Sequence, residues 1–169
     1  ASQVLPSIDD LRQCLRLDPA AGKLYWTVHR GGMKTGEEAF ASVSKALGYR
    51  CGGVLGWKGL AHKVIWALHY GEWPHLSIDH INGDKLDNRI LNLRLATPRQ
   101  NRANQGKTTG RYKKGAQFVS TCRTKPWRAA IFDGSRVKSL GYFRCETAAH
   151  LAYLHEARVL HGDFARTRA

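Results

Sequence analysis

Apolar residues recur in the first part of the chain with a period that changes from segment to segment, and each period predicts an element. Ser7 precedes a short apolar pattern over residues 7–15 and is typical of a helix N-cap, because its hydroxyl accepts a backbone N–H of the first turn. Helical spacing over residues 60–70 predicts a second helix, which ends at Gly71. The segments between them predict a turn over 19–22, a strand over 23–28, a loop over 30–48 and a hairpin with strands 49–53 and 54–58.

A second hairpin is predicted after the second helix. Leu76 and Ile78 alternate with polar neighbours, as residues do in a half-buried strand. The turn signal Asn82-Gly83-Asp84 follows, since Gly and Asn tolerate positive φ. A second strand is then predicted from the alternating apolar positions Leu91, Leu93 and Leu95.

Residues 97–101 predict the start of another helix. Thr97 is suited to the N-cap, Pro98 to the first helical position, and Gln100 completes a capping box. Asn101 would then lie in the first helical turn, facing back over the hairpin. The following residues 102–110 are polar, basic and contain Gly, which predicts a linker. Arg102 and Lys107 of this linker either follow a nucleic-acid backbone or belong to a solvated spacer.

The last part of the chain predicts a small βββα module. Residues 116–122, 127–132 and 137–143 alternate as strands, and Asp133-Gly134 is a hairpin turn. Residues 146–161 predict a helix that ends at Gly162. Its buried stripe is expected at Ala149, Ala152, Tyr153, Ala157 and Leu160.

Charge narrows the class of partner. Lys and Arg number 27 against 13 Asp and Glu, so the net charge is +14 in a chain of 169 residues. Such an excess indicates a polyanionic partner, most often nucleic acid, although a merely solvated surface is the plain alternative. The 43% of hydrophobic residues excludes wholesale disorder. No apolar run reaches the roughly 20 residues of a membrane span, and no signal-peptide pattern is expected at the start.

The four cysteines, at positions 14, 51, 122 and 145, are widely scattered and form no Cys-x-x-Cys pair. No structural zinc is therefore expected. Free cysteines fit a reducing compartment, and a cytoplasmic, DNA-associated location in a bacterial or phage-infected cell is expected.

The candidate metal ligands and the candidate general base lie in the segment 77–101. Asp79 and Asn101 can supply the oxygen ligands that a hard divalent cation prefers. His80 stands beside the first of them, and histidine is the side chain best suited to act as a general base near neutral pH. His62, on the preceding helix, is either a buried structural histidine or a phosphate contact.

Asp79-His80, Asn92 and Asn101 match in order and spacing the motif of HNH nucleases, and the segment resembles the ββα-metal finger of phage and homing endonucleases. The resemblance implies that Asp79 and Asn101 bind one Mg²⁺ or Mn²⁺, that His80 is the base, and that Asn92 fixes the loop. The last position is Asn rather than His, as in one homing-endonuclease branch. A plain hairpin and helix would explain Asn82, Asp87 and Asn88 as turn formers, but not His80 followed by Asn101.

The motifs "WRAAI", "LGYF", "AAHLAY" and "HGDFA" in residues 110–165 resemble the Apetala/ethylene-response-factor DNA-binding domain. The resemblance implies that the sheet enters the major groove. Trp127 belongs either to that surface or to the core. Cys145 at the helix N-cap and Phe132 on the second strand depart from the plant pattern, so the plant target sequence does not transfer. The DNA contacts implied by position are Arg111, Lys113, Arg123, Lys125, Arg128, Arg136 and Lys138.

The sequence therefore predicts an α+β protein: a nuclease domain over 1–101 with its finger at 76–104, a basic linker over 102–110, and a DNA-binding domain over 111–169. The expected activity is metal-dependent hydrolysis of phosphodiester bonds in double-stranded DNA, by nicking or double-strand cutting, with Arg94 as a further DNA contact. A DNA-binding regulator with an inactive finger and an RNA-directed protein are the alternatives. Target sequence, preferred metal and the choice between monomer and homodimer stay open.

Overall fold

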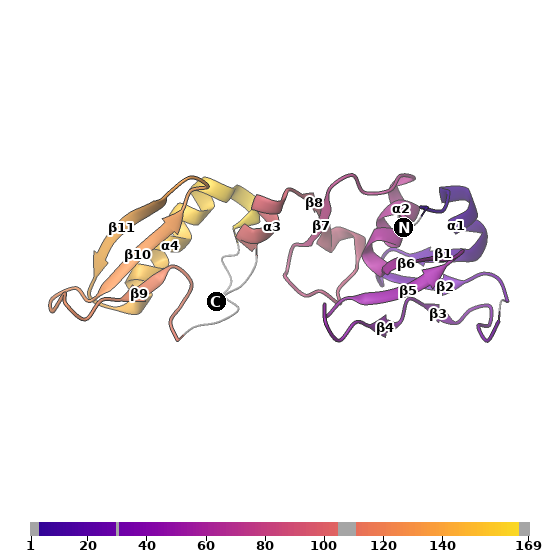
Figure 1. The fold of residues 1–169 in the computed structure, drawn as a ribbon, viewed down its shortest axis with the longest axis horizontal. Coiled ribbons are helices and arrows are strands. Elements are labelled where there is room, and N and C mark those ends of the chain that lie inside the picture. The colour runs from indigo at the N-terminus through magenta and orange to yellow at the C-terminus, as the bar shows by residue number, and fades with distance from the viewer. Residues whose placement is uncertain (1–3, 30, 105–110, 166–169) are drawn as a thin grey trace. The chain divides into compact units, whose positions relative to one another are not determined.

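A computed structural model describes residues 4–29, 31–104 and 111–165 (Figure 1). By their internal contacts the residues fall into two compact units, one ending at Ala96 and the other beginning at Thr97. Each unit is described by itself. Within the described residues no helix is both long and apolar enough to cross a membrane.

The N-terminal unit contains two helices and three small antiparallel sheets among its described residues. The sheets have the orders β1-β2-β3, β4-β5-β6 and β7-β8. Its elements are α1 (Ile8–Cys14), β1 (Leu15–Asp18), β2 (Lys23–Trp26), β3 (Glu38–Ala39), β4 (Ser42–Val43), β5 (Arg50–Val54), β6 (Trp57–Leu60), α2 (Ala61–Tyr70), β7 (Ser77–His80), the 3₁₀ turn η1 (Ile90–Asn92) and β8 (Leu93–Ala96).

Both predicted helices of this unit are confirmed, together with the N-cap of the first and the C-terminal end of the second. The Ser7 side chain accepts the N–H of Asp10, which satisfies one of the open donors of α1. Gly71 ends α2 in the left-handed region at φ 78°, and its N–H bonds to the carbonyl of Ala67. Helix α2 buries Val64, Ile65 and the face around them against α1 and the strands β1, β2, β5 and β6. It is therefore the centre of the N-terminal core.

The predicted hairpin over residues 49–58 is present, but its turn lies later than the sequence indicated. Val54 pairs with Trp57, and the two-residue turn is Leu55-Gly56. Both turn residues have positive φ, 52° and 81°, which matches the twist that two-residue hairpins require. The prediction failed because Leu55 resembles a strand residue rather than a turn residue.

Two further expectations need correction. The predicted loop over 30–48 includes the short strands β3 and β4, whose two residues each are too few to produce a periodic signal. Strand β1 was not predicted, although it pairs along its whole length with β2. Its four residues directly follow α1 without a turn residue, so no boundary is visible in the sequence.

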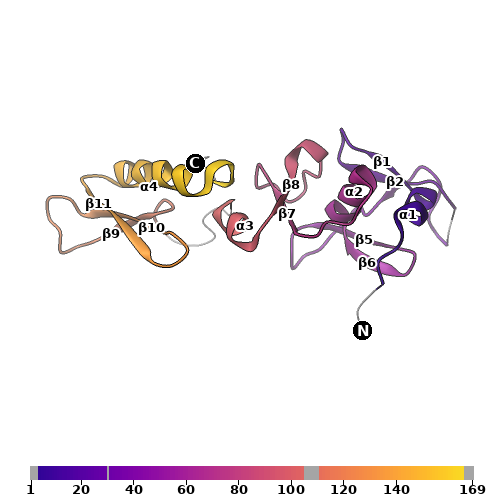
Figure 2. The same cartoon turned by 90° about the horizontal axis from the view of Figure 1, so that it is seen from above.

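The C-terminal unit contains a three-stranded antiparallel sheet of order β11-β10-β9 with helix α4 against one face, as Figure 2 shows. Its elements are α3 (Pro98–Asn104), β9 (Ala116–Phe118), β10 (Trp127–Phe132), β11 (Val137–Phe143), α4 (Glu146–His161) and the 3₁₀ turn η2 (Gly162–Phe164). The predicted order of three strands and a helix is thus present. Strand β9 is shorter than the predicted 116–122, because the chain turns after Phe118 and the N–H of Val119 bonds to the carbonyl of Pro126.

A small core joins α4 to the sheet. Ile131 of β10 packs with Tyr153 and Ala157 of α4. Ala149, Tyr153 and Ala157 of the predicted stripe are buried, and Ala152 and Leu160 are half-buried. Cys145 occupies the N-cap of α4 without a side-chain hydrogen bond. The helix therefore begins without the usual capping contribution of about 1 kcal/mol.

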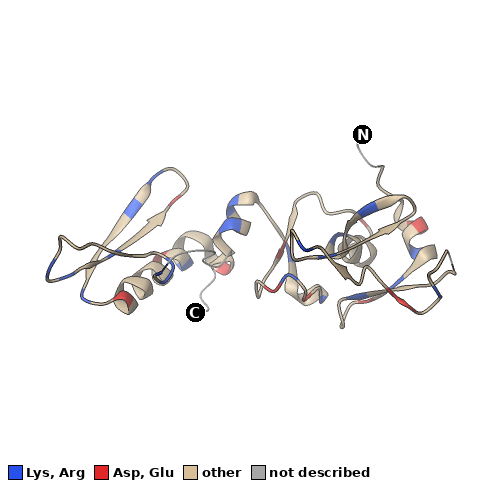
Figure 3. Cartoon of the chain, turned by 60° about the horizontal axis from the view of Figure 1, so that its bottom comes forward, with Lys and Arg blue, Asp and Glu red and all other residues tan. Residues whose placement is uncertain are grey.

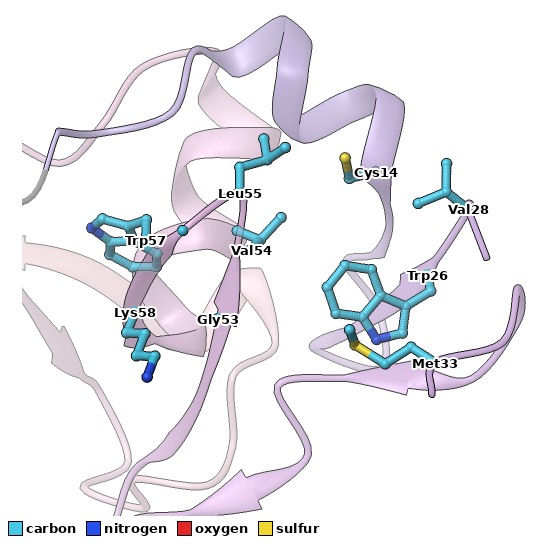
Figure 4. Close-up of a pocket in the computed structure, with 10 residues that line it drawn as sticks. Cys14, Trp26, Val28, Met33, Gly53, Val54, Leu55, Trp57 and Lys58 are labelled. Atoms are coloured by element: carbon cyan, nitrogen blue, oxygen red, sulfur yellow. The ribbon is translucent and has the colours of Figure 1, made fainter. Parts of the chain in front are cut away.

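A cavity of about 280 Å³ lies in the N-terminal unit (Figure 4). Its walls include the indole rings of Trp26 and Trp57, the thiol of Cys14 and the side chain of Met33. No Asp, Glu or His lines it, and Cys14 and Lys58 are its only titratable residues. The candidate chemistry lies instead on the β7–β8 hairpin.

Candidate active site

The pairing of β7 with β8 sets the positions of Asp79 and His80. Asp79 lies opposite Arg94 and His80 opposite Leu93, in antiparallel register. Successive side chains of a strand point to opposite faces, so neighbouring Asp79 and His80 have different surroundings. Both are nevertheless buried, with relative exposures of 5% and 4%.

Asp79 forms a buried ion pair across the hairpin. Nε and Nη2 of Arg94 both lie 2.9 Å from Oδ2 of Asp79. The Arg94 side chain is only 16% exposed. A buried charge is tolerated when it is paired and hydrogen-bonded, so Arg94 stabilises the charged carboxylate at the end of β7. Arg94 was predicted as a DNA contact, and its ion pair gives it a structural role in addition.

His80 is held from several sides. Its Nε2 lies 2.9 Å from Oδ1 of Asn88, which is itself only 1% exposed. The ring of His62 lies edge-on at a centroid distance of 5.2 Å, and that of Tyr49 lies tilted at 5.7 Å. These contacts come from α2, from the chain before β5 and from the loop after β7. They fix the plane of the imidazole ring.

His62 has the buried position that a structural histidine would have. It is 4% exposed and also contacts the ring of Tyr49 at 5.2 Å. Burial, followed by repulsion from His80, lowers the pKa of His62 to about 3. The side chain is therefore neutral at physiological pH and unsuited to bind a phosphate through charge.

Side-chain hydrogen bonds of Asn92 close the loop between β7 and β8. Its Oδ1 accepts the N–H of Asn82 at 2.9 Å. Its Nδ2 donates to Oδ1 of Asn82 at 3.0 Å and to the carbonyl of Asp87 at 2.7 Å. Nδ2 of Asn82 donates in turn to Asp87 Oδ2 at 2.8 Å. Asn92 thus makes the loop hydrogen bonds expected of it, and the segment that contains Asn88 is tied to β7.

The same network explains a wrong prediction. The second strand was expected to include Leu91, but residues Ile90–Asn92 form the turn η1 and β8 begins at Leu93. Leu91 is 91% exposed. The inward side chain of Asn92, 8% exposed, requires the local turn, and its hydrogen bonds outweigh the apolar alternation that suggested a strand.

An ion pair stiffens the loop at Asp87. Arg89 contacts the Asp87 carboxylate through Nε at 2.8 Å and Nη2 at 2.7 Å. Hydrogen bonds from Arg89 lower the pKa of Asp87 to about 2. The carboxylate therefore keeps its charge, and its bonds to Arg89 and Asn82, throughout the neutral range.

The predicted capping box at the start of α3 is confirmed. Thr97 donates its N–H and its hydroxyl to Oε1 of Gln100, both at 2.9 Å, and the N–H of Gln100 returns to Oγ1 of Thr97 at 3.3 Å. Asn101 lies in the first turn and is half-buried. Because α3 belongs to the C-terminal unit, the pairing of Asn101 with Asp79 as metal ligands stays a prediction.

The donor chemistry at Asp79 and Asn101 suits a hard divalent cation. Magnesium and manganese prefer carboxylate and amide oxygens and retain several waters, so few protein ligands are needed. Within the described parts of the chain no group of three or more His, Cys, Asp or Glu could hold a metal ion. The four cysteines, all described, are free.

The predicted DNA contacts of the C-terminal unit occupy different environments. Those that are exposed are Arg102, Arg111, Lys113, Arg123, Lys125, Arg136 and Lys138. Arg128 is half-buried on β10, on the sheet face opposite Ile131. Lys138 forms an ion pair with Glu156 of α4 at 2.7 Å, and Lys107 lies outside the described residues. Figure 3 shows Lys and Arg on α3 and across the strands and loops of this unit.

Sequence reasoning missed the neighbours of His80. Asn88 was interpreted only as a turn former, because Asp87-Asn88-Arg89 has loop composition. Tyr49 was assigned to a hairpin strand with no link to the site. Both are distant from His80 in sequence or separated by a loop, so only the folded arrangement brings them to the ring.

Comparison with known proteins agrees with this site. The model of the HNH endonuclease family matches residues 59–103, from the start of α2 into α3. An uncharacterized HNH endonuclease of Acanthamoeba polyphaga mimivirus is 34% identical over 106 residues, which cover 62% of this chain. The chain spans 54% of that relative's length. No solved structure matches.

A second relative is covered more fully. Protein 3.8 of Escherichia phage T7 is 31% identical over 110 residues, which are 63% of this chain and 88% of the phage protein. The family match includes the Asp79-His80 pair, the loop closed by Asn92 and the capped start of α3. Residues 59–103 therefore form a domain of the HNH endonuclease family.

Proposed function

We propose that the protein is a metal-dependent endonuclease that hydrolyses phosphodiester bonds in double-stranded DNA. One observation carries the proposal: within the segment matched by the HNH family, a buried carboxylate and a buried histidine are neighbours at the end of β7, and each is held by a specific side chain, Arg94 and Asn88 respectively. Protein cores seldom bury such a pair without a use for it, because burying charged and polar groups is costly. Perturbed or buried titratable pairs are common at active sites.

His80 would act as the general base. Its ring takes a proton from the attacking water, and the water oxygen forms the new bond to phosphorus while the 3′-oxygen leaves. The products would carry 5′-phosphate and 3′-hydroxyl ends. Asn92 acts through the loop: by closing it, the side chain keeps the His80 ring correctly oriented.

Asp79 and Asn101 would hold one Mg²⁺ or Mn²⁺. When bound, the ion would stabilise negative charge on the phosphate and on the departing oxygen. Arg94 has its own part, since its ion pair holds the Asp79 carboxylate in a fixed position on β7. The donor set is one of oxygens only, which agrees with a hard cation.

The C-terminal unit would provide affinity for DNA, as its resemblance to Apetala/ethylene-response-factor domains implies. Exposed cations such as Arg123 and Lys125 would contact phosphates, which position the protein without specifying sequence. Arg128, on the open face of the sheet, is the better candidate for a base contact. A homing or other phage-type role would follow from such a combination of nuclease and DNA-binding unit.

Digestion of supercoiled plasmid with Mg²⁺ tests the proposal. Nicked or linear product, lost with EDTA and restored by excess Mg²⁺ or Mn²⁺, is the expected result. A parallel digestion of RNA separates a nuclease for RNA from one for DNA. Tight DNA binding without cleavage in either metal would instead favour a DNA-binding regulator with an inactive finger.

A further inference from the structure

We propose that Asn88 is the positioning residue of the nuclease site: its side-chain oxygen accepts a hydrogen bond from Nε2–H of His80 and so selects Nδ1 as the nitrogen that takes the proton from water. The inference rests on the proposed function for its catalytic meaning. The hydrogen bond itself and the tautomer that it selects do not depend on cleavage.

The contact between the two side chains is short and buried. Oδ1 of Asn88 lies 2.9 Å from Nε2 of His80, and the exposures of the two residues are 1% and 4%. A neutral imidazole has an N–H on one ring nitrogen and a lone pair on the other. The hydrogen bond made by one nitrogen therefore determines whether the second nitrogen carries the N–H or the lone pair. With an amide oxygen at Nε2, the proton stays on Nε2 and the lone pair on Nδ1.

Packing prevents the ring from turning away from this bond. The rings of His62 and Tyr49 lie against His80 at centroid distances of 5.2 and 5.7 Å. His62 lies within α2, where it is buried, and its own environment keeps it neutral. A rotation of the His80 ring would therefore have to displace the buried His62 and the half-buried Tyr49 as well as break the bond to Asn88.

The backbone of Asn88 is anchored on the turn that precedes β2. Gly22 has φ +64°, and a Cβ atom there would lie 2.3 Å from both the Asn88 carbonyl carbon and the Arg89 nitrogen. The N–H of Ile90 also bonds to the carbonyl of Pro19 at 3.2 Å. The peptide after Asn88 thus lies directly on this turn, which holds the amide of Asn88 at a fixed distance from β7.

The surroundings of the Asn88 amide nitrogen, Nδ2, suggest two variants that test the role of its oxygen. Nδ2 is buried and has no hydrogen-bond partner among the described groups. Asn88→Asp therefore keeps an acceptor oxygen at the same place. It removes Nδ2, which makes no hydrogen bond within the described residues. Asn88→Leu has nearly the same shape and removes the acceptor.

The first measurement is the tautomer of His80 in the metal-free protein. A long-range ¹H–¹⁵N spectrum of ¹⁵N-labelled protein distinguishes protonated from unprotonated imidazole nitrogens, and His80→Ala identifies which signals belong to His80. We expect Nε2 to be protonated and Nδ1 unprotonated in the parent and in Asn88→Asp. In Asn88→Leu we expect a mixture of tautomers. An unprotonated Nε2 in the parent would overturn the proposal, whether or not the protein cuts DNA.

The second measurement is turnover with Mg²⁺. In Asn88→Leu we expect kcat to fall by about 10- to 100-fold, the usual effect of removing a group that orients a reacting one, with KM little changed. We expect Asn88→Asp to regain most of this loss. A folded Asn88→Leu variant that keeps the parent's tautomer and kcat would contradict the proposal. If Asn88→Leu does not fold, the parent and Asn88→Asp spectra still decide the case.

Discussion

Asp79 and His80 are neighbours on β7, but their removal would have different consequences for the fold. His80 is hydrogen-bonded to an uncharged amide, that of Asn88, whereas Asp79 balances the charge of Arg94. Removing one partner of a buried neutral bond costs about 1–3 kcal/mol. Removing one partner of a buried ion pair costs about 3–5 kcal/mol, because a charge is left unbalanced.

His80→Ala should remain folded and lose most of its activity. We expect turnover with Mg²⁺ to fall by about 10²–10⁴, the usual effect of a positioned general base. We expect the free energy of unfolding to fall by about 1–3 kcal/mol, because Oδ1 of Asn88 loses its donor. His75→Ala, at an exposed histidine outside the site, is the control and should match the parent in both measurements. Near-normal cleavage by His80→Ala would remove this residue from the mechanism.

The double variant Asp79→Asn/Arg94→Met should separate the two roles of Asp79. Asp79→Asn alone should lower the free energy of unfolding by roughly 3 kcal/mol, because it leaves Arg94 buried without its counter-charge. Replacing Arg94 by Met as well should restore a large part of that loss. Cleavage should be absent from both variants, as assayed on supercoiled plasmid. A stable double variant that cuts DNA would show that the Asp79 carboxylate is not a metal ligand.

At the scale of elements, local chemistry decided which predictions succeeded. The helix starting after Ser7, the helix ending at Gly71 and the capping box of Thr97 and Gln100 were predictable, because each signal acts within a few residues. The boundary at Leu91 was not, because the inward turn of Asn92 depends on Asn82 and Asp87 across the loop.

The candidate site also contains residues that the sequence indicated and residues that it did not. Asp79 and His80 were recognisable from their adjacency and from the spacing to Asn92 and Asn101. The partners that hold them were not, because Arg94 meets Asp79 only through strand register and Asn88 meets His80 only through the folded loop. Sequence spacing thus indicates reacting groups better than it indicates the groups that position them.

Gly22→Ala should impair the candidate site indirectly. The Pro19–Gly22 turn contacts the loop between β7 and β8 that contains Asn88. A methyl group at Gly22 cannot be accommodated unless the backbone of Asn88 and Arg89 shifts. Gly31 provides a matched control, since its φ of +59° is similar and an added Cβ would meet nothing within 4 Å. We expect Gly31→Ala to cost roughly 1 kcal/mol of unfolding free energy from its φ alone.

Gly22→Ala should cost more than this control and should also lower kcat. Thermal unfolding and plasmid cleavage by the two variants check the expectation. Equal losses in the two would mean that the turn at Gly22 does not support the loop that carries Asn88.

At the scale of the whole molecule, the net charge of +14 makes binding to DNA strongly dependent on salt. Exposed cations of either unit could produce this salt dependence. Arg123, Lys125 and Arg136 are exposed on loops of the C-terminal unit. Lys34, Lys45 and Lys63 are exposed in the N-terminal unit and outside the candidate site.

Replacing Arg123, Lys125 and Arg136 by Gln should flatten the salt dependence of DNA binding. Each lost phosphate contact should reduce the slope of log K against log salt by about 0.9. The control replaces Lys34, Lys45 and Lys63 by Gln, which removes the same charge and should leave the slope nearly unchanged. Fluorescence anisotropy with labelled duplex over a salt series measures both. Identical slopes in the two triple variants would mean that the C-terminal unit does not direct the protein to DNA.

The closed loop after β7 also controls a slow covalent reaction. Asn82 precedes Gly83, and such a pair deamidates when the amide nitrogen of the glycine attacks the side-chain carbonyl of the asparagine. In the folded loop the N–H of Gly83 is bound to the carbonyl of His80 at 2.8 Å, and both ends of the Asn82 amide are hydrogen-bonded. Deamidation would place a new carboxylate against that of Asp87, so each event would be permanent damage to the loop. The intact protein should therefore age slowly at this pair and Asn92→Ala quickly, as peptide mass mapping after storage at alkaline pH would measure.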